Sequence, residues 1–182
     1  MDRAEAGAQI HALVKLIFDL NKDHQFTAAD VCELHKTWLG EIYSWAGQYR
    51  QVNLTKGGFP FAAAAQIPAL MDQFGQGPLR ASTPCNFESY DEIAKAMAVV
   101  HTELLLIHPF RDGNGRVGRL LAVGMGYQAG LPSLDFGAIR GKKREEYFAA
   151  VQAGLDQNYE PMERVFRTVI ERSLRNPYLK RV

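Results

Sequence analysis

One segment of the chain combines residue types that can move a proton and bind an anion. Residues 108–119 read His-Pro-Phe-Arg-Asp-Gly-Asn-Gly-Arg-Val-Gly-Arg, which places an imidazole, a carboxylate and a Gly-Asn-Gly bend within twelve residues. Pro109 stops a preceding helix and places His108 at its end. The apolar run that follows predicts a second helix, with Gly115 to Arg119 as its first turn.

The bend between these two predicted helices is suited to a phosphate group. Gly113 and Gly115 let the backbone turn sharply and approach a ligand closely. A helix N-terminus after such a loop offers unpaired N–H groups and the positive end of a dipole. Arg116 and Arg119, three residues apart, leave the same face of the first turn. The segment therefore predicts a polyphosphate site with His108 at its rim.

The same segment resembles the signature of Fic proteins, His-Pro-Phe-x-(Asp/Glu)-Gly-Asn-Gly-Arg-x-x-Arg, and fills every specified position. Residues 43–50 and 56–58 resemble the core and the flap of that family. The resemblance implies an all-α fold, a Fic-type helical bundle with one small β-hairpin flap. It also implies a Mg²⁺-dependent nucleotidyltransferase that uses ATP to attach AMP to a Ser, Thr or Tyr hydroxyl of a target protein.

The resemblance assigns a role to most residues of the signature. His108 becomes the general base, and Asp112 becomes the ligand of Mg²⁺, a cation that prefers carboxylate and phosphate oxygens. The predicted ATP-binding and phosphate-binding residues are Gly113, Asn114, Gly115, Arg116, Arg119, Lys56 and Gly57, with a side-chain donor from Asn114. The four titratable signature residues also have purely structural alternatives: a polar helix cap for the histidine, a turn former for the aspartate and surface ion pairs for the two arginines.

Several neighbouring residues have weaker claims to a functional role. His101 reads as a core histidine or one that supports the site, and its seven-residue distance from His108 does not suit a helical metal pair. Phe110 is expected in the core and Arg111 in solvent. Tyr147 could face the adenine, but an amphipathic helix explains it equally well.

The only strand signal covers Val52–Phe61 and is interrupted by Lys56-Gly57-Gly58, which predicts a hairpin. Its exposed edge could pair with an extended segment of another protein. The resemblance makes this hairpin the flap on which a target docks, with its tip over the nucleotide. The predicted docking residues are Val52, Asn53, Leu54, Thr55, Lys56, Gly57 and Gly58.

Helical periodicity accounts for the rest of the chain. A first apolar stripe comprises Ile10, Leu13, Val14, Ile17 and Phe18. A second, after a Thr27–Asp30 capping pair, comprises Val31, Leu34, His35, Trp38, Leu39, Ile42 and Tyr43. A third, after a Ser89–Glu92 capping box, comprises Ile93, Met97, Val100, Leu104 and Ile107. Later helices are predicted from the glycine loop to about Tyr127, from Arg144 to Gly154 and from Pro161 to Leu174.

Length and composition fit one domain over residues 1–182, with its core at roughly 27–174. A net charge of +1 argues against broad attraction to nucleic acid or membranes, so an anion site must be local. Cys32 and Cys85 have neither metal-ligand nor CxxC spacing, and the chain shows no signal peptide and no long apolar run. A cytoplasmic protein is expected, while secretion into a host stays open.

Regulation is a second expectation from the family. Many Fic proteins carry an inhibitory helix, (Ser/Thr)-x-x-x-Glu-(Gly/Asn), whose Glu pairs with the second signature arginine, here Arg119. The chain has one partial match, Thr37 to Glu41, which lies inside a predicted core helix. An inhibitory helix is therefore expected from a small antitoxin or, alternatively, from an N-terminal segment outside this sequence. Without such inhibition the chain is expected to be toxin-like. Transfer of another nucleotide or of phosphocholine, phosphorylation, AMP removal and a non-catalytic nucleotide-binding module remain as alternatives.

Overall fold

The computed structural model describes residues 3–19 and 21–177. In chain order the elements are α1 (Arg3–Asp19), α2 (Ala28–Leu39), β1 (Thr55–Lys56), β2 (Phe59–Pro60), the 3₁₀ turn η1 (Ala64–Gln66), α3 (Ile67–Phe74), the π-helical turn η2 (Gly75–Leu79), α4 (Arg80–Ser82), α5 (Tyr90–Ile107), α6 (Asn114–Gln128), the 3₁₀ turn η3 (Phe136–Ala138), α7 (Lys142–Ala153), the 3₁₀ turn η4 (Gly154–Asp156) and α8 (Glu160–Arg175). The predicted all-α class with one small β-hairpin is confirmed. No helix in the described part of the chain combines the length and apolar character needed to cross a membrane.

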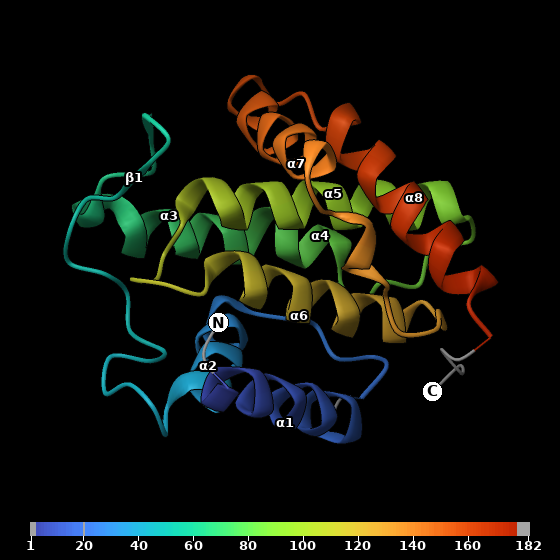
Figure 1. The fold of residues 1–182 in the computed structure, drawn as a ribbon, viewed down its shortest axis with the longest axis horizontal. Helices are drawn as coiled ribbons and strands as arrows, with labels where there is room; N and C mark the ends of the chain where they lie inside the picture. Colours follow the sequence, from blue (N-terminus) through green and yellow to red (C-terminus); the bar gives the residue numbers. More distant parts are fainter. Residues whose placement is uncertain (1–2, 20, 178–182) are drawn as a thin grey trace.

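Helix α5 runs through the middle of the molecule (Figure 1). It packs against α7 and α8 on one side, against α6 on the other, and also against α3. Helices α1 and α2 pack on each other and on α6, so α6 lies between them and α5. The hairpin stands beside the C-terminal end of α5, at the left of Figure 1. The loop that joins α5 to α6 is therefore close to the hairpin.

Capping boxes define where the two best-predicted helices begin. The Asp30 N–H donates to the Thr27 hydroxyl, and the Thr27 N–H donates to the Asp30 carboxylate. Ser89 and Glu92 form the same pair at the start of α5. Each box satisfies two backbone donors that a helix start would otherwise leave without partners. The helices predicted from these two signals are confirmed, and α6, α7 and α8 lie within two residues of their predicted bounds.

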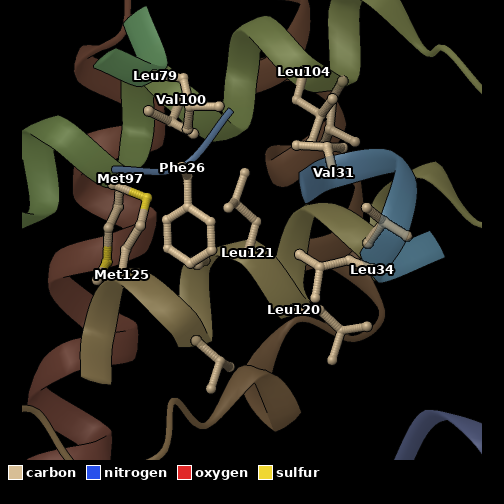
Figure 2. Packing of buried hydrophobic residues seen from close by; sticks show 14 of the residues in the cluster. Phe26, Val31, Leu34, Leu79, Met97, Val100, Leu104, Leu120, Leu121 and Met125 are labelled. Atoms are coloured by element: carbon tan, nitrogen blue, oxygen red, sulfur yellow. The ribbon is translucent and has the colours of Figure 1, made fainter. Parts of the chain in front are cut away.

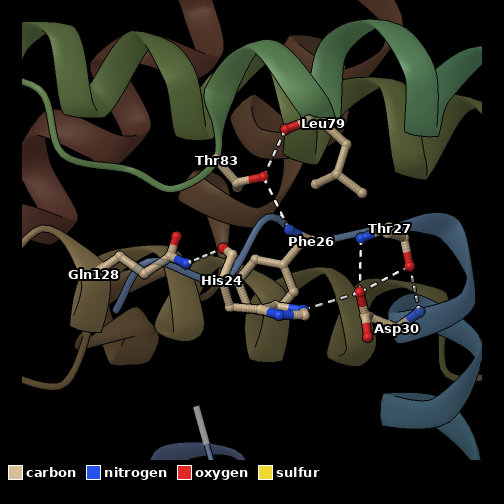
Figure 3. A network of polar contacts seen from close by, with 7 residues as sticks. All are labelled: His24, Phe26, Thr27, Asp30, Leu79, Thr83 and Gln128. Atoms are coloured by element: carbon tan, nitrogen blue, oxygen red, sulfur yellow. Dashed lines mark hydrogen bonds and ion pairs between the residues drawn. The ribbon is translucent and has the colours of Figure 1, made fainter. Parts of the chain in front are cut away.

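A polar network anchors the segment that leads into α2 (Figure 3). The Thr83 hydroxyl accepts the Phe26 N–H and donates to the Leu79 carbonyl. The Gln128 amide donates to the carbonyl of His24, whose ring contacts the Asp30 carboxylate at 3.1 Å. These contacts tie the entry to α2 to the end of α6 and to the η2–α4 segment.

The segment that leads into α2 also packs on the hydrophobic core through Phe26 (Figure 2). One cluster of buried apolar side chains extends from Ala12 in α1 to Ile170 in α8. Phe26 packs between residues of α5 and α6, including Met97, Leu121 and Met125. Burial of a large apolar side chain typically stabilises a fold by about 1.5–3 kcal/mol, so this cluster is the main support for the α5–α6 pair.

The predicted stripe of α1 is wrong in part. Ile10 and Val14 are 65% and 47% exposed, whereas Ala12 is buried and Leu13 and Leu16 pack against the core. The helix has apolar residues on two faces, and it buries the one where small Ala12 allows close approach. The side chain of Phe18 lies outside the described residues.

Three further differences concern element boundaries. Helix α2 ends at Leu39 rather than at Tyr43, although Ile42 and Tyr43 still pack on the core. Gly57 and Gly58 both adopt positive φ and form the turn of the hairpin. Each strand has only two residues, far fewer than the predicted Val52–Phe61 run, and the carbonyls of Val52 and Ala62 beyond them accept from Arg50. The α3 helix was not predicted, although Ile67, Met71 and Phe74 form a buried stripe at helical spacing.

Candidate active site

A cavity of about 770 Å³ lies where the α5–α6 loop, the hairpin and α7 meet. Its volume is typical of sites for small molecules. The lining includes four basic side chains and two carboxylates, so it is polar at one end. The residues that line it are Glu5, Lys56, Phe61, Leu105, His108, Asp112, Gly113, Asn114, Gly115, Arg116, Arg119, Ile139, Arg144, Tyr147, Phe148 and Val151.

His108 lies at the rim of this cavity and ends α5. Its backbone has φ 52 and ψ 58, a left-handed conformation that is unfavourable for a residue other than glycine. Nδ1 lies 3.2 Å from the Leu105 carbonyl, which can only accept, so this nitrogen carries the proton and Nε2 is left as an acceptor. Phe61 of the hairpin side stacks on the ring at a centroid distance of 3.7 Å.

The protonation state of His108 follows from this environment. Burial lowers its pKa to about 4, and the nearby positive charges of Arg50 and Lys56 act in the same direction. The imidazole is therefore neutral at neutral pH, with Nε2 able to take a proton. A neutral histidine with its second nitrogen fixed by a hydrogen bond is the form that a general base requires.

Arg50 holds the His108 segment in its unusual conformation. Its guanidinium donates to the carbonyls of His108, Val52 and Ala62 at 2.8, 2.6 and 2.6 Å. The backbone N–H of Arg50 donates to the Pro109 carbonyl. The residue as a whole is only 1% exposed, and its guanidinium forms no ion pair with a described carboxylate. Arg50 thus connects the end of α5 to both ends of the hairpin segment through backbone carbonyls alone.

Two buried side chains shape the loop between His108 and α6. Asn114 accepts the Phe110 N–H and donates to the Phe110 carbonyl, both at 2.8 Å, which closes the loop on itself. The Gly47 N–H donates to Nδ1 of His35, so Nε2 of that ring donates to the Asp112 carbonyl. His35 also stacks on Phe110, and burial lowers its pKa to about 4.

This geometry corrects one prediction and supports others. The Asn114 side chain was expected to donate to phosphate, but it is 2% exposed and committed to the loop backbone. The backbone N–H groups of Asn114 and Gly115 have no acceptor within α6, because they belong to the first turn. Phe110 is fully buried and Arg111 is exposed, as predicted.

Gly113 permits the close approach of the loop to α2. Its φ is 83, and a Cβ at this position would lie 2.7 Å from Cζ3 of Trp38. Gly115, in contrast, has nothing within 4 Å of a built Cβ, which leaves open space at the α6 N-terminus. The first glycine is needed for packing, and the second leaves room in the cavity.

The two signature arginines differ in their partners. Arg116 binds the carboxylates of Glu5 and Asp112, each at 2.9 Å, and its guanidinium lies 4.5 Å from the centre of the Trp38 ring. Arg119 forms no ion pair with a described residue, and burial lowers its pKa, with Arg116 and Arg144 acting in the same direction. Arg119 is therefore the signature cation with no competing carboxylate.

His101 and Tyr147 support the wall beside Arg119. Tyr147 is 5% exposed, and its hydroxyl lies 2.6 Å from Nε2 of His101, which is itself buried. The prediction that His101 belongs to the core is confirmed. Tyr147 was expected either to face the adenine or to pack within an amphipathic helix. Its hydroxyl is packed against His101, and its ring also borders the cavity.

The hairpin tip closes the far side of the cavity. The Lys56 ammonium lies 4.6 Å from the centre of the Phe148 ring on α7, and the Arg144 guanidinium lies over the same ring. Lys56 borders the cavity as predicted, but its partner here is an aromatic face. Residues 52, 53 and 55–58 are exposed, so the outer edge of the hairpin is accessible.

Three site residues were not singled out from the sequence as functional. Arg50 and His35 lie in segments predicted as core, and Glu5 lies in a helix predicted from its apolar residues alone. The Arg50 position had a signal, because a charged residue directly before a hairpin and beside an otherwise apolar core needs a partner. Glu5 had none, since it contacts Arg116 from 111 positions away.

Comparison with known proteins places this site in a known family. Residues 25–125 match the model of the Fic/DOC family. The protein adenylyltransferase Fic of Culex quinquefasciatus is 31% identical over 156 residues, 85% of this chain but 30% of that protein, so the chain spans about a third of this relative. The N-terminal Fic domain of a VirB-translocated Bep effector from Bartonella quintana aligns with a TM-score of 0.72 at 27% identity, over 91% of this chain and 80% of that one. BepC of Bartonella tribocorum, solved with bound AMPPNP, aligns with a TM-score of 0.67 at 26% identity, over 91% of this chain and 85% of that one.

Proposed function

The chain belongs to the Fic/DOC family, and we propose that it is a protein adenylyltransferase, which moves AMP from ATP to a Ser, Thr or Tyr hydroxyl of a target protein. One observation carries this proposal. His108 offers a neutral imidazole with an unprotonated Nε2 at the rim of a cavity that also contains the N-terminus of α6 and Arg119. Binding a nucleotide would not require such a base.

The proposed chemistry has one covalent step. Nε2 of His108 takes the proton of the target hydroxyl as its oxygen bonds to the α-phosphorus of ATP. The bond from this phosphorus to the bridging oxygen breaks, and pyrophosphate leaves. The N–H groups of Asn114 and Gly115 and the guanidinium of Arg119 bind the negative charge of the leaving group.

A magnesium ion is part of this proposal. The Asp112 carboxylate suits such an ion, because its side chain is 67% exposed at the cavity and only one of its oxygens is bonded, to Arg116. Asp112 would hold the ion, which when bound neutralises charge on the phosphate oxygens. The residues present therefore fit the cofactor.

The target and the regulator are also proposals. The exposed hairpin edge suits a target segment that pairs with it through main-chain hydrogen bonds. Arg119 has no described carboxylate partner, which suits inhibition by a small antitoxin that supplies a Glu in trans. In this setting we propose a toxin-like cytoplasmic enzyme.

The test compares the position of the label on ATP. The chain and its His108→Ala variant are incubated with Mg²⁺, a bacterial lysate and ATP labelled on either the α- or the γ-phosphorus. Protein labelled from α-labelled ATP alone, and only by the parent chain, is the expected result. Labelling from γ-labelled ATP would indicate a kinase, and nucleotide binding without any labelled protein would indicate a binding module.

A further inference from the structure

Glu5 contributes to the phosphate end of the cavity from the first turn of α1. We propose that Glu5 is a positioning residue, which holds Arg116 in place for the phosphates when Asp112 turns to a metal ion. This inference rests on the proposed function and adds to it a residue outside the Fic signature. It predicts that α1 is part of the nucleotide site and not only a helix that covers the core.

Glu5 is fixed before it contacts the arginine. Its carbonyl accepts the Trp38 indole N–H at 2.9 Å, and its Oε1 accepts the Tyr43 hydroxyl at 3.1 Å. Oε2 is left for Arg116, at 2.9 Å from Nη1. Each polar atom of Glu5 beyond its N–H thus has a separate donor. The whole residue is 7% exposed, so solvent competes little for these contacts.

The two carboxylates that share Arg116 are not equivalent. The Glu5 side chain is 9% exposed, whereas that of Asp112 is 67% exposed. An exposed ion pair is weak and easily exchanged, whereas a buried charge keeps its partner, because an unpaired buried charge is costly. Asp112 is therefore the carboxylate that can leave Arg116, and Glu5 is the one that remains.

The contacts of Arg116 allow anchoring and phosphate binding together. Glu5 bonds to Nη1 and Asp112 to Nη2, and Trp38 covers one face of the guanidinium. When Asp112 leaves, Nη2 is free to donate to a phosphate oxygen while Nη1 stays on Glu5. A guanidinium has five N–H donors, so it can serve an anchor and a ligand at once.

The sign of the effect separates this role from simple electrostatics. Removal of a negative charge near a phosphate site should by itself strengthen binding of an anion. Loss of an anchor should weaken it, both because Arg116 becomes mobile and because Asp112 becomes its sole carboxylate and is less available to the metal. The direction of the change in affinity is therefore diagnostic.

The experiment measures binding of an ATP analogue with a methylene bridge between the α and β phosphorus atoms, by calorimetry over a series of Mg²⁺ concentrations. Glu5→Gln removes the charge, Glu5→Asp keeps the charge but shortens the reach, and Asp19→Asn removes an exposed charge at the far end of α1. We expect both Glu5 variants to bind about tenfold more weakly and to need more Mg²⁺, as is typical for residues that orient a ligand-binding group, and Asp19→Asn to match the parent.

A double-mutant cycle tests whether Glu5 acts through Arg116. In an Arg116→Gln background, Glu5→Gln should change the affinity less than about twofold, since the group it positions is gone. Unchanged or tighter binding by the Glu5 variants in the parent background overturns the proposal. Tighter binding would mean that Glu5 competes with the phosphates.

A second measurement needs no nucleotide. NMR of the Arg116 guanidinium should show restricted rotation about the Cζ–Nη bonds in the parent and in Asp19→Asn, and faster rotation in Glu5→Gln. Equally restricted rotation of the Arg116 guanidinium in the parent, Asp19→Asn and Glu5→Gln overturns the anchoring role. If the parent binds no nucleotide, the proposed function fails, and this measurement still decides whether Glu5 holds Arg116.

Discussion

Acid should destabilise this protein through three buried histidines. Burial lowers the pKa of His35, His101 and His108 to about 4, from an ordinary value of 6.5. Because the pKa is lower in the folded chain, the unfolded chain takes up protons first as the pH falls. These groups therefore cost no stability above pH 6.5, and the loss grows as the pH falls from 6.5 toward 4.

The size of the loss follows from the same values. Between about pH 7.5 and about pH 5.5, each histidine lowers the free energy of unfolding by about 1.4 kcal/mol, or about 4 kcal/mol for the three together. A typical domain has only about 5–15 kcal/mol of stability, so the change is a large part of the total. Urea unfolding followed by circular dichroism at the two pH values measures it directly.

Variants separate the histidines from other acid effects. His101→Gln should unfold more easily at both pH values but should lose about 1.4 kcal/mol less between them, because one titrating group is gone. His11→Gln, at an exposed position of α1, should keep the change seen in the parent. A free energy of unfolding that is equal at the two pH values, or a pH dependence unaffected by His101→Gln, would refute the reasoning.

The remaining predictions concern the site. His108→Ala should lower transfer of AMP by about 10²–10⁴-fold while leaving binding of ATP intact, measured with α-labelled ATP, because the imidazole acts on the target hydroxyl. Arg119→Ala should weaken both ATP binding and AMP transfer. Asp112→Ala should lose activity that added Mg²⁺ partly restores. If both variants bind ATP as tightly as the parent, their assigned roles are contradicted. Gly113→Ala should destabilise the fold by about 1–3 kcal/mol in urea unfolding, because a Cβ would meet Trp38 and the positive φ would remain. Expression of the chain should slow bacterial growth, and the His108→Ala form should not.

The parts of the fold that could be predicted are those with local signals. The Thr27–Asp30 and Ser89–Glu92 pairs predict where α2 and α5 begin, and Pro109 predicts where α5 ends, because each acts within one helical turn. The α1 stripe could not be predicted correctly from periodicity alone. Its buried face depends on which side of the helix α2 and α6 cover, and Ala12 contributes little hydrophobicity to reveal it.

The site shows the same division. The backbone groups and side chains that the signature supplies lie together at the cavity, as predicted from their spacing. Asn114 was assigned to phosphate because its type allows it, but only the folded loop shows that Phe110 occupies both of its polar atoms. Glu5 acts on Arg116 over a long sequence distance, so no local pattern indicates it. Arg50 acts on the distant His108, and its only signal is a charged residue directly before the hairpin.

The acid sensitivity and the proposed catalysis have one physical origin. His108 must be neutral to accept a proton, and its burial, in part beneath the stacked Phe61 ring, and the nearby Arg50 guanidinium keep its pKa low. Arg50 also binds the backbone of the left-handed His108, so one residue opposes protonation and offsets strain. A variant that reduces this burial should therefore raise the pKa of His108 and lower the strained segment's stability together. A base that is protonated near neutral pH would slow transfer, so resistance to acid and activity are expected to change in opposite directions at this position.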